Sequence, residues 1–133
     1  MVRLPHTALA ELQQLRVSMV SRGEIFGLPA ELVVYRGGAK PRYCLVAAVD
    51  GARAHLVPGT SKAASGPAVI VEVGETNLIL RTEFDFSVSF PLALSDLVAQ
   101  GRPAGSLAPA RLIDIDSAIA ASNLVAVKRL MSS

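Results

Sequence analysis

The stretch that decides the fold is Lys40-Pro41-Arg42-Tyr43-Cys44-Leu45-Val46-Ala47-Ala48-Val49, which is followed by His55-Leu56-Val57-Pro58-Gly59-Thr60-Ser61. The first segment begins with basic residues and continues as an almost unbroken apolar run, which predicts a β-strand buried on both faces. The second segment predicts another short strand that ends at Pro58 and Gly59, residues that favour a turn. A fixed cation at one strand end and hydroxyl groups at another could therefore face the same surface.

Between these two segments lies Asp50-Gly51, a typical turn of a β-hairpin. Antiparallel partners place the start of one strand beside the end of the next. Counting outward from the turn gives about eight residues to Arg42 in one direction and to Thr60 in the other. The spacing alone therefore predicts that Arg42 and Thr60 lie close together.

The composition is that of an ordinary globular domain. The chain has 133 residues, of which 51% are hydrophobic, enough for a self-sufficient core. The 13 basic and 11 acidic side chains leave a net charge of +2, well below that of proteins that bind nucleic acid chiefly by neutralising phosphates. We expect a single domain over residues 1–133, with a leading helix at 1–20, a β core at 21–92 and a helical C-terminal part at 93–133.

The single cysteine, Cys44, excludes an internal disulfide and lies within an apolar run, so we expect a buried, inert thiol. Its neighbour Arg42 keeps open the alternative of a reactive thiol. No segment has the pattern of a cleavable leader, and no apolar run approaches the ~20 residues needed to cross a bilayer. We therefore expect a cytoplasmic protein that does not enter a membrane.

Two amphipathic helices are predicted, one near each end of the chain. The first is expected over Ala8–Val20 with Thr7 as its cap, and the second over Pro109–Met131. The apolar stripe of the first helix is formed by Leu9, Leu12, Leu15 and Met19. We expect this stripe to pack within the chain, over an edge of the sheet, with contact to a second subunit as the alternative.

The remaining segments predict short strands, a loop and a short helix. Strands are expected at Ser21–Pro29, Glu31–Tyr35, Ala68–Val73, Leu78–Leu80 and Phe84–Pro91, a loop at Arg36–Lys40, and a helix from a cap at Ser95 through Ala99. Within the last strand, phenylalanines alternate with polar residues, which favours core positions over a surface for base stacking.

The motifs Lys40-Pro41-Arg42 before Leu45-Val46, and Val57-Pro58 before Thr60-Ser61, resemble the core of the PemK/MazF-like endoribonuclease toxins. The resemblance runs over about residues 21 to 130 in short pieces. It implies a small SH3-like β-barrel with helices, here with an added N-terminal helix and a C-terminal helix. The family usually has proline directly after the arginine, where this chain has Tyr43; if Lys40-Pro41 is the matching pair, the functional cation is Lys40.

The resemblance implies a toxin of a toxin–antitoxin pair that cleaves single-stranded RNA without metal or cofactor, works as a homodimer and is bound by an antitoxin protein. Arg42 and Thr60 would be catalytic, and Lys40, Ser61 and Lys62 would bind the RNA. An arginine suits this chemistry because its planar, permanently charged fork can stabilise the charge that builds on phosphate oxygens.

A proton acceptor is not placed by the sequence; the candidates are His55, Glu24, Glu83 and Asp85. We expect His55 to be an exposed structural residue, although its ordinary pKa suits proton transfer. Paired carboxylates at Asp114 and Asp116 do not suggest a metal site, since residues two apart on a helix do not face each other. The alternative function is a non-catalytic SH3-like module that binds protein or nucleic acid in the same groove.

Overall fold

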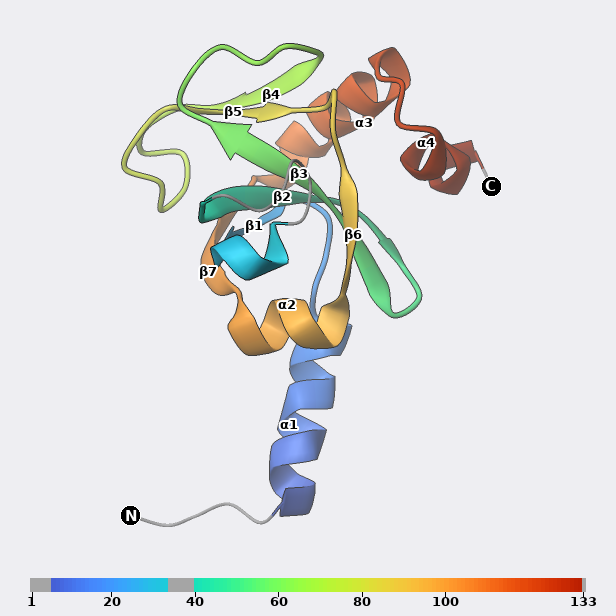
Figure 1. The fold of residues 1–133 in the computed structure, drawn as a ribbon. Coiled ribbons are helices and arrows are strands. Elements are labelled where there is room, and N and C mark those ends of the chain that lie inside the picture. Colours follow the sequence, from blue (N-terminus) through green and yellow to red (C-terminus); the bar gives the residue numbers. More distant parts are fainter. Residues whose placement is uncertain (1–5, 34–39, 133) are drawn as a thin grey trace.

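The structure is a computed structural model that describes residues 6–33 and 40–132. Over these residues, one curled antiparallel sheet combines with four α-helices (Figure 1). The strands are β1 (Glu24–Leu28), β2 (Arg42–Asp50), β3 (Arg53–Thr60), β4 (Ala68–Val71), β5 (Thr82–Asp85), β6 (Phe90–Ala93) and β7 (Arg102–Ser106). The helices are α1 (His6–Ser18), α2 (Leu94–Gln100), α3 (Leu112–Ala121) and α4 (Val125–Ser132), with short 3-10 helices η1 (Ala30–Leu32) and η3 (Pro109–Arg111).

The hairpin of β2 and β3 forms the centre of the sheet. Its turn is at Gly51, whose positive φ of 57° suits glycine, and Asp50 pairs with Arg53. β1 pairs with the free side of β2, and β7 pairs with β1. The free side of β3 pairs with β6 near the turn and with β5 near Thr60. The order β4-β5-β3-β2-β1-β7 confirms the predicted hairpin.

The central strands carry apolar side chains on both faces, as the apolar run predicted. One face contributes to a core with residues of β4, β5, α3 and α4, including Leu45, Val57, Phe84 and Ile115. The other face packs with α2 and η1, and it includes Cys44, Val46, Leu56 and Leu97. Because successive residues point to opposite sides of a strand, a strand between two cores must be apolar at nearly every position.

The prediction of one continuous helix over Pro109–Met131 is wrong. The segment is divided into η3, α3 and α4, and the break between α3 and α4 falls at Ser122. The Ser122 hydroxyl donates to the carbonyl of Ile119 and accepts from the amide of Leu124 at 3.2 Å. A serine that bonds to nearby backbone groups competes with the helical pattern, which explains the break. Similarly, α2 begins after Ala93, and Ser95 is not its cap.

The predicted strands also need correction. Residues 30–32 form η1 instead of the start of a strand at Glu31, and Val33 after it has no regular structure. Residues 34–35 of that predicted strand and residues 36–39 of the predicted loop at 36–40 lie outside the described residues. Residues 78–80 do not form a strand: Leu78 has no regular structure, and residues 79 and 80 form a bend. The predicted strand at Phe84–Pro91 is divided into β5 and β6, because the Ser87 amide donates to Asp85 Oδ1 at 2.9 Å and closes a turn. Phe84, Phe86 and Phe90 are nevertheless buried, as expected.

The last β-strand, β7, was not predicted, and it lies within the segment expected to be helical. It forms the edge of the sheet, and its Pro103 faces Phe26 of β1. Proline is tolerated there because an edge strand has one side without a partner. Residues 93–133 therefore add a strand to the sheet as well as helices.

Helix α1 does not pack its predicted stripe within the chain. It extends away from the sheet and touches α2 near its C-terminal end (Figure 1). Val17 and Val20 pack against the core, and Arg16 Nη2 donates to the carbonyl of Val98 at 3.3 Å. The stripe is exposed: Leu9 by 51%, Leu12 by 47%, Leu15 by 56% and Met19 by 68%. The helix therefore joins the fold through a neighbouring face and leaves its most apolar stripe uncovered.

Candidate functional site

The open end of the β2–β3 hairpin brings together the two residues that the spacing predicted. Arg42 begins β2 and Thr60 ends β3. Arg42 Nη1 donates to the carbonyl oxygen of Gly59 at 3.2 Å, and the register pairs Cys44 with Pro58. A one-residue irregularity between Val46 and Ala48 leaves this juxtaposition intact. The hairpin therefore places the guanidinium of Arg42 beside the end of β3.

A hollow of about 320 Å³ lies at this point. Four of the five predicted site residues line it: Lys40, Arg42, Thr60 and Lys62. The fifth, Ser61, is exposed on the turn between two of them and is not among the described lining residues. The other lining residues are Val33, Pro58, Gly59, Ala63, Ser65, Asp85 and Val88. Three cationic side chains and one carboxylate give the hollow a positive balance that suits a phosphate group.

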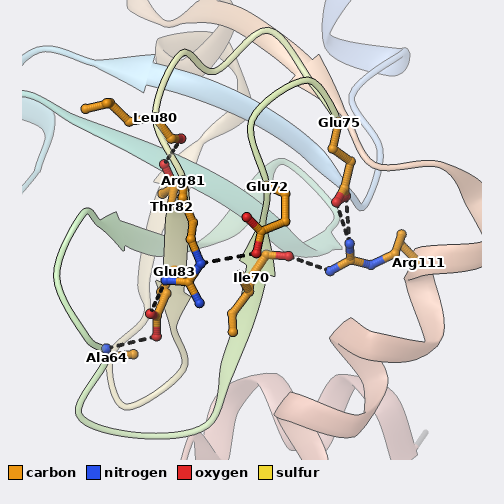
Figure 2. A network of polar contacts seen from close by, with 9 residues as sticks. All are labelled: Ala64, Ile70, Glu72, Glu75, Leu80, Arg81, Thr82, Glu83 and Arg111. Atoms are coloured by element: carbon orange, nitrogen blue, oxygen red, sulfur yellow. Dashed lines mark hydrogen bonds and ion pairs between the residues drawn. The ribbon is translucent and has the colours of Figure 1, made fainter.

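The loop after β3 is held in place by carboxylates of β5. The amide of Lys62 donates to Thr60 Oγ1 at 3.1 Å, which turns the chain back toward the sheet. The amide of Ala64 donates to Glu83 Oε1 at 3.2 Å, and Arg81 Nη1 holds the other oxygen of Glu83 at 2.7 Å (Figure 2). Register places Glu83 directly opposite Thr60. The loop is thereby fastened to β5 next to the hollow.

The sequence suggests Asp85 only as a proton acceptor, whereas the structure shows it bound to two serines of neighbouring loops. Its Oδ2 accepts from the amide and the hydroxyl of Ser65, and its Oδ1 accepts from the amide of Ser87. Burial alone would raise the pKa of Asp85, but the hydrogen bonds from Ser87 and Ser65 have the larger effect and lower the pKa from 3.8 to about 2. A carboxylate held ionised so firmly is a weak base, so Asp85 organises the loop and balances charge.

The other candidates for proton acceptor are no better placed. His55 is 6% exposed, which contradicts the expectation of an exposed residue, and it lies on β3 toward the hairpin turn, paired with Ala48 and Pro91. Burial and the charge of Arg53 lower its pKa despite the opposing charge of Asp50. Glu24 accepts from the amide of Ser21 at the start of β1. None of these side chains lines the hollow.

Cys44 is fully buried, as the apolar run predicted. Burial raises the pKa of its thiol from 9.0 to about 12, although the charge of Arg42 acts in the opposite direction. A thiol with so high a pKa forms almost no thiolate at neutral pH. The alternative of a reactive cysteine is therefore excluded by its environment.

The loops around the hollow could not be assigned to it from the sequence. Ser65 and Asp85 are 20 residues apart and meet only because β3 and β4 both pair with β5. A weak signal exists in Asp85-Phe86-Ser87, since aspartate two residues before serine often forms a turn. That signal indicates a turn but not its neighbour across the sheet.

Within residues 6–33 and 40–132, no cluster of three His, Cys, Asp or Glu side chains is arranged to hold a metal ion. In the same part of the chain, no helix is both long and apolar enough to span a bilayer. No protein-family model and no curated protein matches this chain.

Proposed function

We propose that this chain is a metal-independent endoribonuclease of the PemK/MazF-like kind that cleaves single-stranded RNA at the Arg42 hollow. The observation that carries the proposal is that Arg42 and Thr60 line one hollow together with Lys40 and Lys62. The resemblance of the motifs that supply these residues adds to it. The curled antiparallel sheet supports the SH3-like barrel that this family has.

In the proposed reaction, the 2′-oxygen of one nucleotide attacks the neighbouring phosphorus. The bond from phosphorus to the 5′-oxygen of the next nucleotide breaks, which leaves a 2′,3′-cyclic phosphate and a 5′-hydroxyl. The 2′-hydroxyl loses a proton to solvent and the departing 5′-oxygen gains one, so the step is balanced without metal or redox chemistry. The negative charge on the non-bridging oxygens increases as the new bond forms.

Arg42 is suited to stabilise that charge. Its guanidinium stays charged and offers several donors in one plane, of which Nη1 already bonds to the carbonyl of Gly59. This bond orients the fork, so less conformational freedom is lost when phosphate binds. The Thr60 hydroxyl accepts from the amide of Lys62 and can still donate its own proton to a phosphate oxygen. Lys40 and Lys62 would hold the adjoining phosphates.

Asp85 favours a second function, in which the chain binds its ligand without cleaving it. Since the pKa of about 2 makes Asp85 a weak base, the hollow is better equipped to bind phosphate than to remove a proton. A module that binds RNA or a protein segment without cleaving it would use the same cations. High-level production of the chain without harm to the host would favour this second function.

The test is incubation of the purified chain with single-stranded RNA in the presence of a chelator. The expected products carry 2′,3′-cyclic phosphate ends, and Arg42→Ala should slow cleavage by about a hundredfold or more. Arg53→Ala is the matched control, because Arg53 is an exposed arginine at the other end of the same hairpin. Cleavage that continues undiminished in Arg42→Ala would exclude Arg42 as the catalytic group.

The proposal extends to the partners and the setting of the protein. The uncovered stripe of α1 supports a homodimer, in which two copies of the Arg42 hollow would serve one RNA. A toxin of this kind acts in the cytoplasm and is held inactive by an antitoxin protein. Helix α1 projects from the sheet and carries these exposed apolar residues, so it is suited to such assembly.

A further inference from the structure

A second hollow, of about 620 Å³, lies next to the first, and Arg42 lines both. Its walls come from the ends of β1 and β2, from β7 and from the loop before β5. Its lining residues include Gly27, Arg42, Tyr43, Asn77, Gln100 and Arg102. A phosphate bound at Arg42 would therefore be next to both hollows.

Three of the lining residues form a row across three neighbouring strands. Gly27 of β1 pairs with Tyr43 of β2 on one side and with Arg102 of β7 on the other. A Cβ atom at Gly27 would lie 3.4 Å from Tyr43 Cε1 and 3.9 Å from Arg102 Cβ. Because glycine has no side chain, the Tyr43 ring can pack directly over Gly27 at the centre of the row.

Tyr43 is 47% exposed, so it does not serve as a core residue. Packing over Gly27 explains where the ring lies, but it does not explain why polar residues line the same hollow. Asn77 and Gln100 bring amide groups that can both donate and accept, and Arg102 brings a cation. A flat apolar surface bordered by such groups matches a nucleobase, which has a flat face and a polar edge.

The loop that carries Asn77 is fixed in position by hydrogen bonds to β7, η3 and β4. The backbone amide of Asn77 donates to the backbone carbonyl of Ala104 on β7 at 3.3 Å. In the same loop, Glu75 accepts from Arg111 Nη1, with 2.7 Å to Oε2, and Arg111 Nη2 donates to the carbonyl of Ile70 at 2.7 Å (Figure 2). Helix η3 and strand β4 thereby anchor the loop, and the wall of the hollow is preorganised.

We propose that the second hollow is a nucleobase subsite in which Tyr43 stacks on the base of a nucleotide adjacent to the phosphate at Arg42. This inference rests on the proposed function, since RNA at Arg42 determines which ligand reaches Tyr43. It assigns a substrate-binding part to the residue that departs from the usual proline of the resembling toxins. Stacking on an aromatic ring tolerates any base, so the subsite contributes affinity and position more than sequence preference.

The test compares two probes of equal length and charge: a 2′-O-methyl oligoribonucleotide, which has no 2′-hydroxyl to attack, and the corresponding abasic strand. Their dissociation constants are measured by fluorescence anisotropy for the full chain and its variants. Wild-type protein should prefer the strand with bases, and Tyr43→Ala should reduce that preference by about 5-fold to about 140-fold. Affinity for the abasic strand should not change, which separates lost stacking from damaged structure.

Two further variants sharpen the result. Tyr43→Phe keeps the ring and should keep the preference for bases. Gly27→Val keeps the tyrosine residue but puts a branched side chain where its ring packs, so it should displace the ring and reduce the preference as Tyr43→Ala does. Thermal unfolding of each variant checks that the fold is retained.

The outcomes are distinct from those of the proposed function. Binding that depends on Arg42 while Tyr43→Ala keeps the full preference for bases would overturn the subsite alone. RNA that binds with the predicted dependence on Tyr43 but is never cut would support the subsite and overturn the proposed cleavage. No binding of either probe by wild-type protein would overturn both proposals.

Discussion

Arg42 Nη1 and the carbonyl oxygen of Gly59 lie 3.2 Å apart across the open end of the β2–β3 hairpin. The bond joins the first residue of one strand to the penultimate residue of the next. It depends on how closely β3 can approach its neighbours at Gly59. The position of the candidate phosphate site is therefore linked to the absence of a side chain at this glycine.

Gly59→Ala should destabilise the protein by about 1–3 kcal/mol, because the added carbon has no room. A Cβ atom there would lie 2.7 Å from Thr82 Cγ2, 3.0 Å from Phe84 Cε1 and 3.1 Å from the carbonyl oxygen of Tyr43. Chemical denaturation measures the loss. Gly27→Ala is the matched control, since its nearest contact would be an ordinary 3.4 Å and its cost should be much smaller. Equal costs for the two variants would contradict the close packing at Gly59.

The centre of the fold could be predicted because its signals are local. An apolar run of the length of β2 requires burial on both faces. Asp50-Gly51 specifies the hairpin, so counting residues outward from this turn predicts that Arg42 and Thr60 lie close together. The exposed position expected for His55 was wrong, because β6 covers that end of β3. Strand neighbours that are distant in sequence are not visible in a local pattern.

The same limit applies to β7 and to the second hollow. Pro103 argues against a strand, and only the free edge of β1 makes one possible there. The row formed by Tyr43, Gly27 and Arg102 joins three segments, and no spacing rule brings them together. Residues of a site that come from one hairpin could be predicted, whereas those supplied by distant strands could not.

Asp85 should give the protein a distinct loss of stability in acid. Its pKa in the folded state, about 2, lies below the ordinary 3.8, because hydrogen bonds from Ser65 and Ser87 outweigh the effect of burial. The folded state therefore binds this proton less readily than the unfolded state, and the stabilisation is complete above 3.8 and is lost as the pH falls from 3.8 toward 2. Denaturation at a series of pH values measures the slope.

Asp85→Asn should lower stability at neutral pH and flatten the dependence within that acid range, since an amide does not titrate there. Asp96→Asn is the control, because Asp96 is exposed on α2, away from the hollow. It should retain the wild-type slope. An unchanged slope in Asp85→Asn would contradict the assignment of the acid transition to Asp85.

Cys44 should be unreactive toward thiol reagents in the folded protein. The residue is fully buried, and burial raises its thiol pKa to about 12, so very little thiolate forms near neutral pH. Reaction with a chromogenic disulfide should be slow in buffer and fast in concentrated urea. Because the pKa is raised from 9.0, the unfolded chain ionises first, and stability should fall as the pH rises from 9.0 toward 12. Rapid native labelling would contradict the burial.

Helix α1 should mediate a homodimer. Its stripe of Leu9, Leu12, Leu15 and Met19 is exposed, and a projecting helix with such a stripe can bury it against the same stripe of a second copy. Light scattering at micromolar concentration should give twice the chain mass of 13.9 kDa.

The double variant Leu12→Glu with Leu15→Glu should give the single mass, because burying carboxylates in an apolar contact is costly. Gln14→Glu, on an exposed position away from the stripe, should remain dimeric. A mass near 13.9 kDa for the wild-type chain would refute the dimer, and dimers that survive the double variant would move the contact away from α1.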